Sequence, residues 1–188
     1  MSGEVDRSAD DSETTGSPLW AKVGTVIVGL VLVGFIALLA TRDDEAGSGV
    51  SRLLGRAVPE LEGTTLDGGS FDIDAARGRW VLVNFFASWC VPCEVEHPEL
   101  VDFSERHDDG SAVVVSVLMG DTPENGRAFF DLRGGDWPVI IDADSAPARF
   151  SVPQVPETFL VSPSGLVAGH WTTDFTADSA DEIIQALS

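Results

Sequence analysis

The stretch that most restricts the fold of this chain is WVLVNFFASWCVPC, which spans residues 80–93. Its first part, residues 80–88, is β-branched and aromatic at successive positions, as expected for a central strand that is buried on both faces. Cys90 and Cys93 follow at once, and the pattern predicts a helix from residue 91 to about residue 107. A buried strand that passes directly into a helix predicts an α/β fold.

Strand-like and helix-like segments alternate through the rest of the C-terminal part. Asp67, Gly68 and Gly69 separate two short, partly apolar runs and predict a hairpin turn. Further strands are predicted at residues 112–119 and 138–142, and in the runs TFLVS and LVAGHW on either side of residues 163–165. Further helices are predicted from Thr122 and Pro123 to Gly134, near residues 146–150, and through Leu187 behind a capping box of Ser179 and Glu182. This order predicts an α/β sandwich around one mixed sheet.

The composition is that of a folded, strongly acidic protein. Hydrophobic residues make up 44% of the 188 residues and include 10 Phe and 5 Trp, which is enough apolar mass for one packed core. The formal net charge is -20 at pH 7. A surface of this sign repels phosphates, so we expect no nucleic acid among the partners.

The N-terminal part predicts a membrane anchor. Residues 1–18 are polar and acidic and predict a disordered tail. Residues 19–41 contain an uncharged apolar run, VGTVIVGLVLVGFIALLA, which at about 1.5 Å per residue comes close to the ~30 Å hydrocarbon core of a bilayer. A cleaved secretory signal and a buried core helix are the alternatives, but the run is long for a signal and ends in ALLATR rather than Ala-x-Ala. Residues 42–57 predict a polar linker, and residues 58–188 predict the folded domain.

The position of the two cysteines predicts reactive thiols. Cys90 falls at the N-terminus of the expected helix, where unpaired N–H groups and the positive end of the dipole favour a thiolate. A pKa lowered from about 8.5 to about 7 would raise the thiolate fraction at pH 7 from roughly 3% to roughly half. Cys93 lies one turn later and deeper, within reach to resolve a mixed disulfide by intramolecular attack. Pro92 fixes the backbone between them.

Two other uses of the cysteine pair are less favoured. A structural zinc site needs four ligands, and beyond the cysteines the chain offers only three histidines, His97, His107 and His170. A purely structural disulfide between Cys90 and Cys93 would close a very short loop and gain little from chain entropy. We therefore expect no metal, and a redox-active Cys90–Cys93 disulfide in place of any cofactor.

Two stretches, VLVNFFASWCVPCEVEHP and VPQVPETFLVSPSG, resemble a known family. They are similar to the membrane-anchored, thioredoxin-like thiol-disulfide oxidoreductases of the TlpA, ResA and CcmG (DsbE) group, which is tied to cytochrome c maturation. The similarity runs from about Val58 to Leu187. It implies a thioredoxin fold, in which helices flank a mixed central sheet, with an N-terminal transmembrane helix.

The resemblance implies roles for residues on both sides of the cysteines. Pro156 is expected to be a cis-proline facing the active site, and Val155 to offer backbone groups to an extended substrate segment. Glu96 is expected to assist proton movement at the cysteines. Trp89 and Glu157 complete the expected substrate-binding set.

Three of these assignments have alternatives. Ordinary cytosolic thioredoxins have a buried aspartate where this chain has Asn84, so the resemblance implies that Glu96 or Glu157 accepts the proton instead. Both carboxyls could also be solvated surface acids. Trp89 could shield the cysteines or cap the core.

The implied function is that of a membrane-tethered protein-disulfide reductase. A single-pass anchor in the cell membrane would hold the catalytic domain on the extracytoplasmic side. The expected substrates are exported proteins with cysteines, above all apocytochrome c, and a dithiol kept reduced there needs a membrane electron donor of the CcdA or DsbD type. A thiol oxidase of exported proteins, with the opposite redox poise, is the first alternative. A non-catalytic adaptor or a copper-handling module on the same fold is the second.

Overall fold

The computed structural model describes residues 28–34, 51–141, 143 and 145–188. The chain forms two units, Met1–Ser48 and Gly49–Ser188. In the first unit the described residues, 28–34, are helical. No helix within the described residues is long and apolar enough to cross a bilayer. The predicted tail, and most of both the predicted span and the predicted linker, lie outside the described residues.

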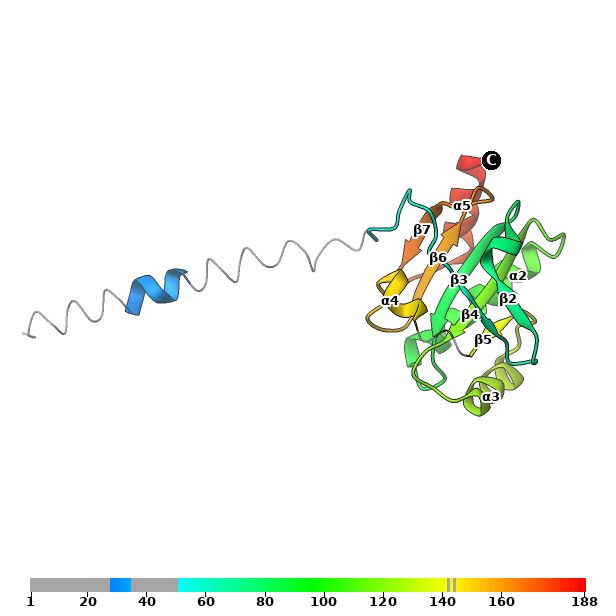
Figure 1. Ribbon diagram of the computed structural model, residues 1–188, viewed down its shortest axis with the longest axis horizontal. Helices are drawn as coiled ribbons and strands as arrows, with labels where there is room; N and C mark the ends of the chain where they lie inside the picture. Colours follow the sequence, from blue (N-terminus) through cyan, green and yellow to red (C-terminus); the bar gives the residue numbers. More distant parts are fainter. Residues whose placement is uncertain (1–27, 35–50, 142, 144) are drawn as a thin grey trace, which may run out of the picture. The chain divides into compact units, whose positions relative to one another are not determined.

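The second unit is built on one five-stranded mixed sheet with the strand order β5-β4-β3-β6-β7 (Figure 1). The central strand β3 (Trp80–Phe86) pairs in parallel with β4 (Ala112–Leu118) and antiparallel with β6 (Glu157–Val161). At the edges, β5 (Val139–Ile140) is parallel to β4, and β7 (Val167–Trp171) is antiparallel to β6. All seven residues of β3 are buried, which confirms the central strand predicted from its composition.

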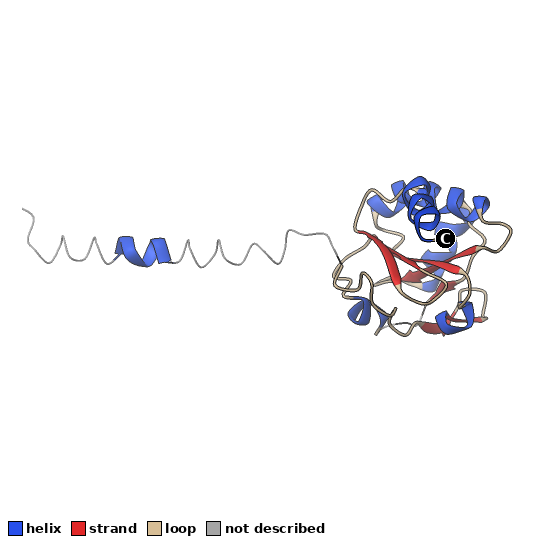
Figure 2. Cartoon of the chain, turned by 90° about the horizontal axis from the view of Figure 1, so that it is seen from above, coloured by secondary structure: helices blue, strands red, loops and turns tan. Residues whose placement is uncertain are grey.

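Helices cover both faces of the sheet (Figure 2). Helices α2 (Val91–Arg106) and α5 (Ala177–Leu187) pack on one face, where their apolar residues join a cluster with Trp80 and Leu82 of β3. The 3-10 helix η1 (Ile73–Ala76) and the short helix α4 (Ala146–Phe150) pack on the other face. Helix α3 (Pro123–Arg133) brings Phe129 into the cluster that holds both cysteines. This arrangement confirms the predicted thioredoxin-like α/β fold.

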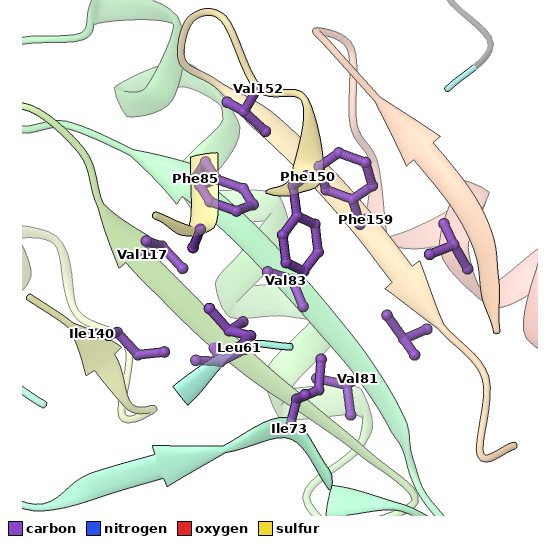
Figure 3. Close-up of a cluster of buried hydrophobic side chains, with 14 of the residues drawn as sticks. Leu61, Ile73, Val81, Val83, Phe85, Val117, Ile140, Phe150, Val152 and Phe159 are labelled. Atoms are coloured by element: carbon purple, nitrogen blue, oxygen red, sulfur yellow. The ribbon is translucent and has the colours of Figure 1, made fainter. Parts of the chain in front are cut away.

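The core on the α4 face is centred on three aromatic rings (Figure 3). Phe85 lies 5.2 Å from Phe150 and 6.0 Å from Phe159 between ring centroids, and the latter two are 5.3 Å apart. Tilted and edge-on arrangements of this kind are the favourable ones for aromatic pairs. Aliphatic side chains surround the rings, among them Leu61, Ile73, Val81, Val83, Val117, Ile140 and Val152.

A separate hairpin, β1 (Glu62–Thr64) with β2 (Ser70–Asp72), confirms the turn predicted at residues 67–69. The backbone N–H of Leu66 donates to the carbonyl of Val139 at 2.9 Å. This bond attaches the end of the hairpin to β5. Because β5 is an edge strand, the hairpin covers backbone groups that would otherwise be unpaired.

The start of α5 corrects one prediction from the sequence. The N-cap is Thr176 rather than Ser179, and Ser179 instead occupies the third helical position of the capping box. The Thr176 hydroxyl accepts the N–H of Ser179 at 3.2 Å, while a carboxylate from α2, Glu99, accepts the N–H of Ala177 at 3.0 Å. The predicted pair of Ser179 with Glu182 followed the more common Ser-x-x-Glu pattern, and here a serine takes the place of the acid.

Candidate active site

The two cysteines form a disulfide at the point where β3 gives way to α2. Their Cα atoms are 5.2 Å apart. Cys90 is the N-cap of α2, and its Sγ accepts the backbone N–H of Cys93 at 3.2 Å. This N–H is one of the unpaired donors of the first helical turn, so the same contact would stabilise a thiolate on Cys90. Both residues are only 3% exposed, so solvent exposure does not distinguish Cys93 from Cys90.

Trp89 projects from the loop before Cys90 and does not cap the core. It is 64% exposed, and its indole Nε1 donates to the carbonyl of Gly120 at 3.2 Å. Val91 and Val95, on the first turns of α2, are also largely exposed. Apolar side chains held at the surface beside a reactive disulfide are suited to contact another polypeptide.

The Val155–Pro156 peptide bond is cis, as predicted. Pro156 directly precedes β6, and Val155 packs against the buried cluster that contains Cys90 and Cys93. The fold therefore brings the residue before the cis-proline to the cysteines, although more than sixty positions separate them in the sequence.

A buried polar row runs across the sheet beneath α2. Asn84 of β3 is paired in register with Ser116 of β4 and with Thr158 of β6. Oε1 of Glu96, from α2, accepts the Thr158 hydroxyl at 2.6 Å and Nδ2 of Asn84 at 3.1 Å. The Asn84 amide also donates to the Thr158 hydroxyl oxygen at 3.0 Å, and its carbonyl accepts the Ser116 hydroxyl at 3.4 Å. These bonds hold one buried carboxyl in a fixed position under the helix that carries Cys93.

The environment of Glu96 makes its carboxyl easier to protonate. Burial raises the pKa of Glu96, and the hydrogen bonds from Thr158 and Asn84, which favour the ionised form, offset that effect only in part. Both hydrogen bonds go to Oε1, and within the described part of the chain no hydrogen bond is recorded at Oε2. Glu96 also lines a cleft of about 230 Å³. The other lining residues are Pro92, Val95, Glu99, Pro156, Thr173, Asp174, Phe175 and Thr176. A proton can therefore reach Glu96 from solvent.

Glu157 is buried on the opposite face of β6 from Thr158. Its Oε2 lies 2.8 Å from Nε2 of His170, and both side chains are shielded from solvent. The His170 ring stacks on Phe159 at 4.4 Å between centroids. Glu157 is therefore neither a surface acid nor part of the Glu96 row. The sheet separates the two carboxyls that the sequence presents as alternative proton acceptors.

The three histidines lie in separate environments. His97 is buried among Phe129, Phe130 and Trp137, and its Nε2 lies 2.9 Å from the carbonyl oxygen of Gly134. Burial lowers the pKa of His97 below its ordinary value. Within the described residues, no group of three His, Cys, Asp or Glu side chains could hold a metal ion.

Several site residues were not identified from the sequence. Thr158 and Ser116 complete the row around Asn84 and Glu96, and Asp121 holds the loop that carries Trp89. The sequence contained a usable signal for Thr158, which lies two residues after the cis-proline inside the recognised stretch. Ser116 and Asp121 carry no local signal, because their partners come from another strand and another loop.

The chain is similar to known thiol-disulfide oxidoreductases. The family model described as the AhpC/TSA family matches residues 54–170. The thiol:disulfide interchange protein HelX of Rhodobacter capsulatus is 31% identical over 166 residues, which cover 82% of this chain and 92% of HelX. The thiol-disulfide oxidoreductase ResA of Geobacillus thermodenitrificans is 25% identical over 135 residues, covering 71% of this chain and 78% of ResA.

Solved structures show the same fold. A thiol:disulfide interchange protein of the thioredoxin family from Chlorobium tepidum superimposes with a TM-score of 0.64 at 24% identity, covering 73% of this chain and 97% of that one. A secreted Mycobacterium tuberculosis disulfide oxidoreductase, described as homologous to DsbE of E. coli, gives a TM-score of 0.59 at 21% identity. It covers 67% of this chain and 95% of its own.

Proposed function

Because this chain belongs to the AhpC/TSA family, and within it to the thioredoxin-like thiol-disulfide oxidoreductases that include HelX and ResA, we propose that it reduces disulfides in exported proteins. It is a thiol-disulfide oxidoreductase whose active site is its CxxC motif. The observation that carries the proposal is the hydrogen bond from the Cys93 N–H to Sγ of Cys90 at the start of α2. This contact supports Cys90 as the attacking thiolate.

The first step is attack by the reduced enzyme. The Cys90 thiolate attacks one sulfur of a substrate disulfide, so that a mixed disulfide forms and the other substrate sulfur leaves as a thiolate. The exposed Trp89, and the backbone of Val155 beside Pro156, support binding of an extended substrate segment next to Sγ of Cys90. Glu157, fixed by His170 at the start of β6, supports this binding edge from the far face of the sheet.

The second step releases the substrate. The Cys93 thiol loses its proton, and its sulfur attacks Sγ of Cys90, which forms the Cys90–Cys93 disulfide and frees the second substrate thiolate. Two electrons pass from the enzyme dithiol to the substrate. Glu96 lies one helical turn after Cys93, on the same side of α2, and burial raises its pKa, which makes its carboxylate a stronger base for the Cys93 proton. Its access to the cleft supports exchange of that proton with solvent.

The cellular setting follows from the N-terminal part of the sequence. Residues 19–41 act as a single-pass anchor in the cell membrane, and residues 42–57 tether the folded domain on the extracytoplasmic side. Apocytochrome c, whose CxxCH cysteines must be reduced, is the substrate that we put first. The enzyme is returned to its dithiol form by a membrane electron donor of the CcdA or DsbD type, which supplies the two electrons.

A trapping experiment tests the proposal. The full chain with Cys93→Ser, expressed in the cells that produce this protein, should accumulate mixed disulfides between Cys90 and exported cysteine proteins. A matched variant with both Cys90→Ser and Cys93→Ser should trap none. Recovery of partners that contain no exported cysteine protein would reject the assigned substrate class.

A redox titration determines the direction of transfer. The Cys90–Cys93 couple, equilibrated against glutathione, should remain more reducing than the glutathione pool. A potential clearly above that of the pool would instead support the oxidase alternative. A difference of about 30 mV is enough to decide, since it corresponds to about 1.4 kcal/mol, or about tenfold in the equilibrium constant, for a two-electron couple.

A further inference from the structure

Two neighbouring loops meet directly in front of the disulfide. β3 and β4 are adjacent parallel strands, so the loops that follow them emerge at the same edge of the sheet. The N–H of Met119 donates to the carbonyl of Phe86 at 2.9 Å, and the indole of Trp89 donates to the carbonyl of Gly120 at 3.2 Å. The loop after β4 is therefore hydrogen-bonded to the loop that leads into Cys90.

The carboxylate of Asp121 makes further hydrogen bonds between the two loops. Its Oδ2 accepts the backbone N–H of Ser88 at 2.8 Å and the Ser88 hydroxyl at 2.5 Å. Its Oδ1 accepts the N–H of Thr122 and Nδ2 of Asn125, both at 2.8 Å. Burial raises the pKa of Asp121, but the hydrogen bonds from Ser88, Asn125 and Thr122 outweigh it and hold that pKa below its ordinary value. The group is therefore ionised at neutral pH and receives donors from both loops.

We propose that Asp121 is a positioning residue for the attacking sulfur. Ser88 stands two residues before Cys90, and the N–H of Cys90 closes a turn onto the carbonyl of Ala87 at 3.2 Å. Anchoring Ser88 fixes this turn, and the turn sets Sγ of Cys90 against the N–H of Cys93. The inference rests on the proposed role of Cys90 as nucleophile.

Positioning and charge predict opposite outcomes when the carboxylate is removed. A negative charge near Cys90 disfavours a second negative charge on its sulfur, so loss of that charge alone would lower the Cys90 pKa. Loss of the anchor would loosen the Cys90 sulfur from the helix N-terminus and raise that pKa. The direction of the change therefore identifies which effect Asp121 supplies.

The test is Asp121→Asn in the full chain, reduced and titrated by the pH dependence of iodoacetamide alkylation at Cys90. An asparagine offers one acceptor oxygen, so it can serve the donors of only one loop. We expect the Cys90 pKa to rise by about half a unit to one unit, which from a starting value near 7 slows alkylation at pH 7 about two- to fivefold. The control is Asp131→Asn, an exposed change of the same charge on α3, which should leave the alkylation profile unchanged.

Ser88→Ala gives a second reading that changes no charge. It removes the hydroxyl donor and leaves the backbone bond to Asp121, so a smaller rise in the same direction is expected, and this variant decides the matter if Asp121→Asn does not fold. A lower or unchanged Cys90 pKa, in whichever of the two variants folds, would overturn the proposal. The proposed function fails separately, if the wild-type Cys90 pKa is not below that of a free thiol.

Discussion

Thr158→Val should move the pH dependence of the resolving step. The Thr158 hydroxyl donates the shorter of the two hydrogen bonds to Oε1 of Glu96, at 2.6 Å, inside a buried site. A hydrogen bond to a charged group contributes about 1.5–3 kcal/mol, and about 1.4 kcal/mol corresponds to one pKa unit. Since this bond favours the ionised carboxyl, its loss should raise the already elevated Glu96 pKa by about one to two units.

The assay follows the mixed disulfide that the reduced enzyme forms with oxidised glutathione. Acid quenching at set times and mass spectrometry give the rate at which Cys93 resolves this adduct at each pH. In the Thr158→Val variant, the acid limb of that rate should move to higher pH by about one to two units, because Glu96 must be ionised to accept the proton.

Thr158→Ser is the matched control, since it keeps the hydroxyl and should keep the acid limb of the wild type. An acid limb that stays in place in the valine variant would refute the role given to Glu96. A limb that moves equally in the serine variant would refute the role given to the hydrogen bond.

Three further predictions concern stability, each measured by urea unfolding of the full chain. Phe159→Ala should lower the free energy of unfolding by about 3–5 kcal/mol, because it removes a fully buried ring in contact with Phe85 and Phe150; a loss below about 1 kcal/mol would contradict the packing described. Thr176→Ala should lower the free energy of unfolding by about 1 kcal/mol, because Thr176 is the N-cap of α5. Ser179→Ala should lower it by less, and a larger loss in Ser179→Ala would support Ser179 as the N-cap, as the sequence predicted. His97→Phe should reduce the pH dependence of the free energy of unfolding. Because the pKa of His97 is lowered in the folded state, the stability that its neutral ring contributes is present above the unfolded pKa of about 6.5 and is lost as pH falls through the folded-state pKa. Equal pH dependence in wild type and variant would show that His97 does not titrate in this way.

The elements around the disulfide could be predicted because their signals are local. The composition of residues 80–88 marks a buried strand, and Thr122 with Pro123 marks a helix start, and both predictions are confirmed. The cis bond before Pro156 was predicted from the recognised stretch and not from any physical property of that proline. The membrane anchor stays a prediction, since the described residues cover little of it.

The contacts that complete the site could not be predicted in this way. Asn84, Ser116 and Thr158 form a row only because three strands pair in one particular register, and register depends on the whole sheet. The same alternation of faces puts Glu157 across the sheet from Glu96, although the sequence presents both as acids near the motif. The exposure of Trp89 depends on the hydrogen bond to Gly120, which belongs to another loop.

The amide at position 84 leaves the layer between the sheet and α2 with a single ionisable carboxyl in the polar row. A carboxylate in its place would lie against Oε1 of Glu96, and two acids so close would lose their protons in two mutually dependent stages. With an amide there, proton uptake by that row should follow a simple one-site curve. The redox potential of this protein should then vary with acidity through fewer inflections than that of a relative that carries both acids.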